Sequence, residues 1–194
     1  YYAVAVTQRG YSADARPEPV EAYTMPTLLG DTTRIVHALG AERVHLVGHD
    51  WGGGLAWFVA VARPDLVASL TALSTPHPDP FSDAIADPTS PQYAASAYME
   101  ALREIDESKV TGGLASVTGR FGPDVEPIPP VLASTYADGL SSPEALRGAL
   151  NWYRANVLPM SGRMGPVRVP TLYLWGSDDF AFLRGAPPPA ETGA

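Results

Sequence analysis

The chain contains no cysteine and only one lysine, Lys109. The lack of cysteine excludes disulfides, thiolate nucleophiles and cysteine-based zinc sites. Basic residues are also scarce, with 13 Lys and Arg against 21 Asp and Glu, which gives a formal net charge of −8. Because binding to phosphates requires clustered Lys and Arg, we expect neither nucleic acid nor an anionic membrane surface as a partner.

Long apolar runs are missing as well, since no window of about 18 uninterrupted apolar residues occurs. No signal-peptide pattern is visible either, so the cytoplasm is the default location. His45 and His49 form the only histidine pair at ligand spacing, and they span a strand and its turn. No Lys-Ser/Thr follows Gly52-Gly53-Gly54, as a phosphate loop would require. We therefore expect no metal and no cofactor.

Strand-like and helical segments alternate along the 194 residues, of which 45% are hydrophobic. Apolar runs predict buried strands, and apolar residues at helical spacing predict helices. This alternation is typical of a parallel α/β sheet with its ligands at the carboxyl ends of the strands. The predicted strands are residues 2–6, 44–47, 67–73 and 167–175, and the predicted helices are residues 24–39 and the segment that ends at Arg63-Pro64.

The pattern changes between residues 76 and 166, where prolines and short helical stretches such as 94–105 and 143–154 replace the strands. We interpret this region as an inserted helical cap with proline-rich connections. The predicted organisation is therefore a first core part at residues 1–75, a cap at 76–166 and a second core part at 167–194.

The most informative motif is Gly48-His49-Asp50-Trp51-Gly52-Gly53, which places an aspartate between a predicted strand and a predicted helix. The small residues Gly48 and Gly52 suit a sharp turn in which the backbone approaches its neighbours closely. A carboxylate at the centre is ionised at neutral pH and suited to attack on carbon. The alternative interpretation is an aspartate that caps the following helix.

This motif resembles the nucleophile elbow of the α/β-hydrolase fold, specifically its epoxide hydrolase and haloalkane dehalogenase branch. The resemblance runs almost the whole length of the chain, in the order that the family shows. By that resemblance the chain is expected to lack the first strands and the C-terminal strand and helix of the fold. The further matching segments are Gln8-Arg9-Gly10-Tyr11-Ser12, Ser74-Thr75-Pro76-His77-Pro78, Asn151-Trp152-Tyr153-Arg154 and Val169-Pro170-Thr171-Leu172-Tyr173-Leu174-Trp175-Gly176.

The resemblance implies a catalytic role for Asp50, whose attack on a substrate carbon would form an alkyl-enzyme ester. The backbone N–H of Trp51 would stabilise the oxyanion when that ester is hydrolysed. Tyr153 and Tyr98 match the two cap tyrosines that donate to the epoxide oxygen, although rings at these places also suit ordinary helix packing. Asp179 matches the acid that orients the catalytic histidine.

Two of these assignments leave alternatives open. Asp178, which adjoins Asp179, is the fallback for the acid. Trp51 could bind a leaving halide in a dehalogenase, or line the pocket of an epoxide hydrolase.

The catalytic histidine of the family has no counterpart, because no histidine follows His77. We expect structural roles for His37, His45, His49 and His77. The sequence thus predicts an epoxide hydrolase that opens a small apolar epoxide through an Asp50 ester, with doubtful turnover for the chain as given. The alternatives are a haloalkane dehalogenase-like enzyme and a non-catalytic, truncated hydrolase scaffold.

Overall fold

The computed structural model describes residues 1–110, 129, 134–135, 138–159 and 161–183. The chain divides into two compact units. The first contains Tyr1–Tyr23 with Glu100–Ala155, and the second contains Thr24–Met99 with Asn156–Ala194. The division of the chain into core and cap remains a prediction.

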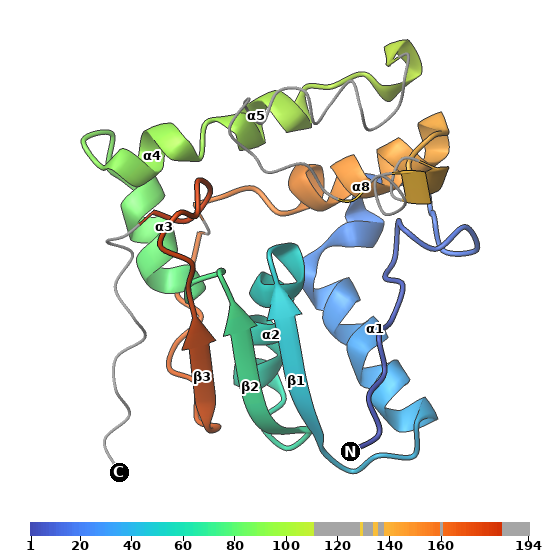
Figure 1. Cartoon of the computed structure of the whole chain (residues 1–194), viewed down its shortest axis with the longest axis vertical. Helices are drawn as coiled ribbons and strands as arrows, with labels where there is room; N and C mark the ends of the chain where they lie inside the picture. Colours follow the sequence, from blue (N-terminus) through green and yellow to red (C-terminus); the bar gives the residue numbers. More distant parts are fainter. Residues whose placement is uncertain (111–128, 130–133, 136–137, 160, 184–194) are drawn as a thin grey trace. The chain divides into compact units, whose positions relative to one another are not determined.

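The second unit contains a parallel sheet with the strand order β1-β2-β3 (Figure 1). The strands are β1 (Val44–His49), β2 (Val67–Leu73) and β3 (Thr171–Leu174). In the register of the sheet His49 lies beside Leu73, and Leu73 lies beside Leu174, so the carboxyl ends of the three strands are level. The predicted parallel α/β sheet is confirmed.

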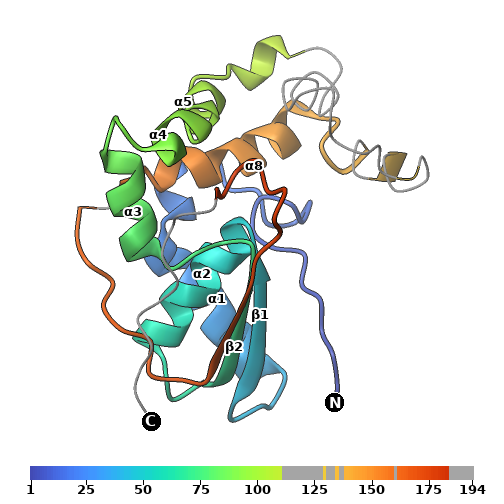
Figure 2. The same cartoon turned by 60° about the vertical axis from the view of Figure 1, so that its left-hand side comes forward.

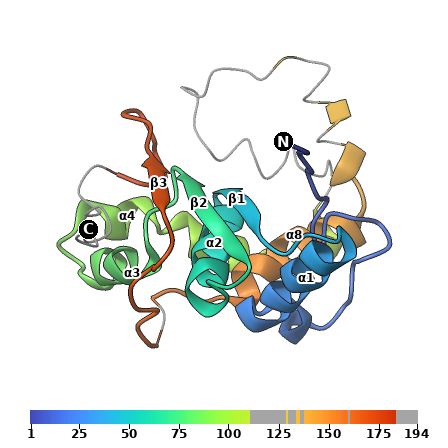
Figure 3. The same ribbon diagram turned by 90° about the horizontal axis from the view of Figure 1, so that it is seen from below.

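Two helices of this unit pack behind the sheet. Helix α2 (Trp51–Ala62) packs on β1 and β2 through an almost wholly apolar surface that includes the fully buried Trp57. Helix α1 (Met25–Ala38) packs in turn on α2, with Leu28 and Val36 buried, and the left-handed Gly40 follows its end. Figures 2 and 3 show both helices on the same face of the sheet.

On the opposite face of the sheet the described part of the chain leaves several apolar side chains exposed, which corrects the prediction of a buried strand at residues 44–47. Val47 is 62% exposed, and Leu172 and Leu174 are about half exposed. In the register of the sheet Val47 and Leu172 flank Thr71, so these side chains share one face. The strand is buried on one side only because α1 and α2 cover a single face.

Two further sequence predictions differ from the structure at strands and helices. The strand predicted at residues 167–175 is shortened to β3, which begins directly after Pro170, because proline lacks the N–H group that a strand interior requires. The helix predicted at residues 94–105 is divided into α4 (Pro91–Ala95) and α5 (Tyr98–Arg103). The break falls at Ser96, whose hydroxyl accepts a hydrogen bond from the Gln92 side chain. Helix α3 (Pro78–Ala86) precedes α4 and packs against it.

The first unit is built around α8 (Pro143–Ala155), which packs on the 3₁₀ turns η1 (Val20–Tyr23) and η2 (Glu107–Lys109). The Trp152 indole donates a hydrogen bond to the Arg9 carbonyl over 2.9 Å. A Cβ at Gly148 would lie 2.5 Å from the Gly10 carbonyl oxygen, so the two chain segments touch backbone to backbone. The helix predicted at residues 143–154 is confirmed.

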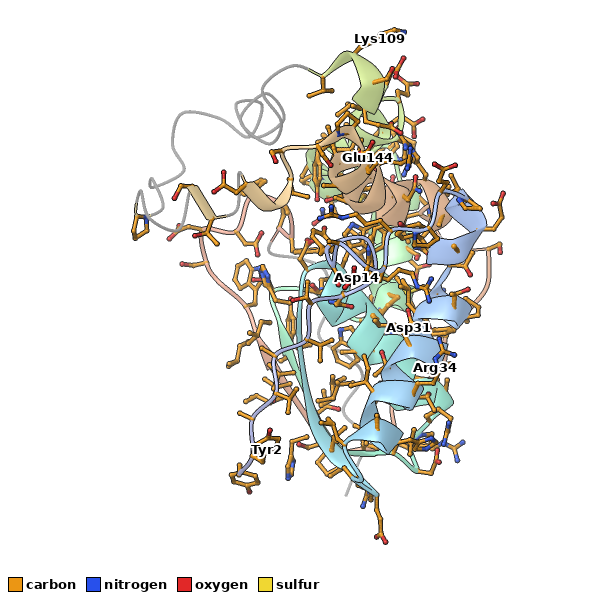
Figure 4. All side chains as sticks on the ribbon, turned by 90° about the vertical axis from the view of Figure 1, so that its right-hand side faces the viewer. Tyr2, Asp14, Asp31, Arg34, Lys109 and Glu144 are labelled. Carbon is orange, nitrogen blue, oxygen red and sulfur yellow. The ribbon has the colours of Figure 1, made fainter. Side chains whose placement is uncertain are left out.

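The strand predicted at residues 2–6 is wrong. This segment is extended but belongs to no sheet, and the Tyr2 side chain is 90% exposed (Figure 4). Its apolar residues have strand propensity, but a strand forms only where a neighbour satisfies its backbone N–H and C=O groups.

None of the described helices combines the length and the apolar character needed to span a bilayer.

Candidate active site

Asp50 lies between the end of β1 and the start of α2, at the level where the strands end. Its backbone angles are φ 52° and ψ −126°, a conformation that residues with a side chain rarely adopt. The Asp50 side chain makes no capping hydrogen bond to α2. The helix-cap interpretation is therefore wrong, and the carboxylate is presented by a strained turn instead.

The glycines of the motif are required by close backbone contacts. A Cβ at Gly48 would lie 2.3 Å from the Gly52 carbonyl oxygen and 2.9 Å from Cβ of Ala56. A Cβ at Gly53 would lie 2.6 Å from Oγ1 of Thr75. The sequence predicted the need for Gly48, but it missed the contact between Gly53 and Thr75.

Thr75 supports the turn from the end of β2. It is 7% exposed, and its hydroxyl donates to the main-chain carbonyl of Asp50 over 2.8 Å. The indole of Trp57 donates to the Thr75 carbonyl over 2.9 Å. The preceding residue, Ser74, has a positive φ of 60°, and its carbonyl accepts from the Tyr173 hydroxyl over 2.9 Å.

Tyr98 lies near Asp50, the predicted nucleophile, and Asp179, the predicted partner of the catalytic histidine. Burial raises the pKa of its hydroxyl, and the negative charges of Asp50 and then Asp179 raise the pKa further. These electrostatic interactions place Asp50, Tyr98 and Asp179 in one neighbourhood. At neutral pH the phenol therefore keeps its proton and can donate a hydrogen bond.

Asp179 lies in the loop after β3 and is fixed by its own chain. Its Oδ1 accepts hydrogen bonds from the backbone N–H groups of Ala181 and Phe182, each over 2.9 Å. Asp178 is exposed, and its Oδ2 accepts a hydrogen bond from the Ser177 hydroxyl over 3.3 Å. These hydrogen bonds favour Asp179 over Asp178 as the candidate for the acid of the site.

Gln92 of α4 makes two hydrogen bonds to the loop that contains Asp179. This buried amide donates to the Ala181 carbonyl over 2.7 Å and accepts from the Leu183 N–H over 2.8 Å. Phe182 between them packs edge-on against Phe81 of α3. No sequence pattern marks Gln92, because a single glutamine in a short helix has nothing to distinguish it.

Tyr173 of β3 is a second tyrosine that the sequence did not single out. Burial, followed by the charge of Asp179, raises its pKa to about 12. Its hydroxyl hydrogen-bonds the Ser74 carbonyl, so it supports the loop that carries Thr75.

A family model for the alpha/beta hydrolase fold matches residues 4–188. The chain belongs to the α/β-hydrolase fold family. This agrees with the parallel sheet and with the strand, sharp turn and helix around Asp50.

The relatives of this α/β-hydrolase chain confirm its resemblance to the epoxide hydrolase branch. It is 32% identical over 208 residues to epoxide hydrolase 4 of Mus musculus, covering 95% of this chain and 54% of the relative. It is 34% identical over 203 residues to epoxide hydrolase 3 of Xenopus tropicalis, covering 96% of this chain and 53% of the relative. The chain thus spans about half the length of the curated relatives it matches.

A solved structure shows the same similarity. It comes from work on novel epoxide hydrolases of the α/β-hydrolase superfamily in metagenomes from hot environments. The TM-score is 0.81 at 27% identity, and the match covers 92% of this chain and 66% of that chain.

The roles of all the predicted site residues, Asp50, Tyr98, Asp179, Trp51 and Tyr153, remain predictions. Trp51 is half-buried at the first position of α2, where its N–H belongs to the start of the helix. Tyr153 is half-buried on α8, in the first unit.

The sequence predicted structural roles for all four histidines, but only His77 is buried. His77 is buried, its Nδ1 accepts from the Asp79 N–H, and its Nε2 therefore donates to the Gly165 carbonyl over 3.1 Å. Burial lowers its pKa, which the charge of Asp79 partly opposes. The side chains of His37, His45 and His49 are exposed on α1 and β1. Within the described ranges no group of three His, Cys, Asp or Glu side chains gathers as a metal site.

Proposed function

We propose that this chain performs the first half of epoxide hydrolysis, in which Asp50 forms an ester with the substrate. The observation that carries the proposal is the uncapped carboxylate of Asp50 on a strained turn, with Tyr98 and Asp179 in the same neighbourhood. The epoxide hydrolase relatives support it.

The chemistry follows from the charges of these groups. A carboxylate oxygen of Asp50 attacks an epoxide carbon, the new C–O ester bond forms, and the C–O bond of the ring breaks. The ring oxygen then carries the negative charge, and the phenol of Tyr98 donates its hydrogen bond, and finally a proton, to that oxygen. Because the pKa of Tyr98 is raised, the phenol stays protonated until the ring opens and the negatively charged oxygen accepts the proton.

The second half of the reaction hydrolyses the ester and requires a base that activates water. The sequence has no histidine after His77, and His77 is used in the fold. The described residues therefore account for the ester-forming step, and this step is the part of the reaction that we assign to them.

The protonated tyrosine favours an epoxide over a haloalkane as substrate. A departing halide needs no proton, whereas an opened epoxide does. A dehalogenase remains the second enzymatic candidate, and Trp51 is the residue that would support it by donating to the halide. We further propose a small apolar epoxide as the substrate and, as the default, a cytoplasmic location.

Intact mass measurement after incubation with styrene oxide tests the proposal. We expect a mass increase equal to one epoxide, mapped to Asp50 and absent from Asp50→Asn. Asp178→Asn is the matched control, because this neighbouring acid is exposed, and it should still form the adduct.

Three other outcomes would contradict the epoxide proposal. Adduct formation and halide release with haloalkanes only would establish the dehalogenase. Reversible binding without an adduct would establish a non-catalytic scaffold. An adduct that also forms on Asp50→Asn would place the reaction at another residue.

A further inference from the structure

The hydrogen bond from Thr75 to the Asp50 carbonyl joins the segment that follows β2 to the turn that follows β1. The Asp50 carbonyl also accepts the first hydrogen bond of α2, from the Gly54 N–H over 3.0 Å. The Thr75 bond is shorter, at 2.8 Å, and it comes from outside the turn and its helix. It is therefore a tertiary restraint on the main chain of the nucleophile.

The hydroxyl of Thr75 is itself held in place by its surroundings. The Thr75 carbonyl accepts from the Trp57 indole, and the Thr75 N–H donates to the Leu73 carbonyl over 2.7 Å. One residue earlier, the Ser74 N–H donates to the Leu174 carbonyl over 2.7 Å, and the Ser74 carbonyl accepts from Tyr173. The donor thus projects from a segment fixed to both α2 and β3.

A strained backbone persists only where its surroundings determine it, because the chain would otherwise relax. Rotation of the Asp50 carbonyl would turn both the carboxylate of Asp50 and the N–H of Trp51, since these groups share the same stretch of main chain. We infer that Thr75 is a positioning residue, whose hydroxyl holds the strained turn so that the Asp50 carboxylate is aimed at the substrate carbon.

This inference rests on the proposed function, and its test uses the ester-forming step, which needs no histidine. The rate of adduct formation on the full chain is measured against the concentration of styrene oxide for the wild type and for Thr75→Val, Thr75→Ser and Thr75→Ala. Thr75→Val replaces the hydroxyl by a methyl group of similar size. Thr75→Ser and Thr75→Ala both remove the threonine methyl and differ from each other by the hydroxyl alone.

We expect Thr75→Val and Thr75→Ala to lower the maximal rate at least about tenfold, because small misalignments of a nucleophile are costly. The half-saturating epoxide concentration should stay unchanged, since Thr75 acts on the nucleophile and not on the substrate. Thr75→Ser should restore the rate to within about threefold of wild type. Circular dichroism establishes that each variant is folded, and the Ser and Ala pair decides the question if the valine does not fit.

Wild-type rates in Thr75→Val or Thr75→Ala would overturn the inference, as would equal losses in Thr75→Ser and Thr75→Ala. A wild-type chain that forms no adduct is a different failure, because it refutes the proposed function and with it the role assigned to Thr75.

Discussion

At the scale of single residues, the feature that organises the site is the backbone of Asp50. A positive φ in a residue with a side chain costs about 1–3 kcal/mol, which the surrounding contacts must offset. These contacts include the hydrogen bond from Thr75 and the close passage of Gly48 beneath Gly52. The turn therefore tolerates change at some glycines and not at others.

Gly48 and Gly54 should respond to alanine in opposite directions. A Cβ at Gly48 would meet the Gly52 backbone at 2.3 Å, whereas a Cβ at Gly54 meets nothing within 4 Å. We expect Gly48→Ala to lower the free energy of unfolding by about 2 kcal/mol or more. Gly54→Ala lies within α2 and should raise it by about 0.5–1 kcal/mol. Urea denaturation measures both, and equal effects of the two substitutions would contradict the packing described for the turn.

The sequence predicted some residues of the site and missed others for a physical reason. Asp50 and Gly48 belong to one short motif, in which the turn itself imposes the residue types. Thr75, Gln92 and Tyr173 act through contacts between chain segments far apart in sequence, such as the bond from Gln92 to the Ala181 carbonyl. No local pattern marks such residues.

At the scale of elements, the sequence predicted helices and strands correctly where the spacing of apolar residues alone determined the secondary structure. The apolar residues of α1 recur at helical spacing, and β2 was predicted with its observed bounds. Prediction failed where tertiary pairing or a single residue decided. The segment 2–6 has no strand partner, Pro170 directly precedes β3, and Ser96 follows the end of α4.

The start of α3 is tied to the chain at Gly165 by a small polar cluster. His77 donates to the Gly165 carbonyl, while the Asp79 carboxylate accepts from the Met164 and Gly165 N–H groups over 2.7 and 3.1 Å. Trp57 packs edge-on against the His77 ring. The cluster requires neutral His77, because Nδ1 must remain an acceptor for the Asp79 N–H.

Acidification should therefore destabilise the fold through His77. Burial lowers its pKa below the ordinary value of 6.5, so the unfolded chain takes up a proton that the folded chain does not. The resulting stability is complete above about pH 6.5 and is lost as the pH falls through the lowered folded pKa. We expect Tm to fall between about pH 7 and pH 5 in the wild type.

The variant His77→Gln tests this assignment, because glutamine can accept and donate similarly but does not titrate in this range. We expect a lower Tm near neutral pH and a flatter dependence on acidification. An exposed histidine, replaced in His37→Gln, serves as the control and should leave the wild-type slope unchanged. If His77→Gln keeps the wild-type slope, another group is responsible.

At the scale of the whole molecule, the exposed apolar face of the sheet is the feature that we expect to promote self-association. Val47, Leu172 and Leu174 are about half exposed or more on the three-stranded sheet. Apolar patches of this kind promote association between copies. The net charge of −8 opposes that association over long distances but does not cover the apolar surface.

We expect the double variant Val47→Thr, Leu172→Thr to associate less than the wild type at the same concentration. Leu39→Thr is the matched control, because Leu39 is 45% exposed but lies at the end of α1, away from the sheet face. Sedimentation velocity over a range of concentrations measures the effect. A reduction of similar size in Leu39→Thr would show that general surface polarity, and not this face, controls association.

The contact between Gly53 and Thr75 also limits the order in which the turn can change during directed evolution. A Cβ at Gly53 would lie 2.6 Å from Oγ1 and 2.7 Å from Cβ of Thr75, so a serine at 75 relieves nothing. A larger residue at position 53 becomes accessible only after position 75 has become glycine. That intermediate lacks the hydroxyl donor to Asp50. Libraries that vary one position at a time will therefore not reach a larger residue at position 53, and only paired randomisation of positions 53 and 75 can reach an alternative support for the turn.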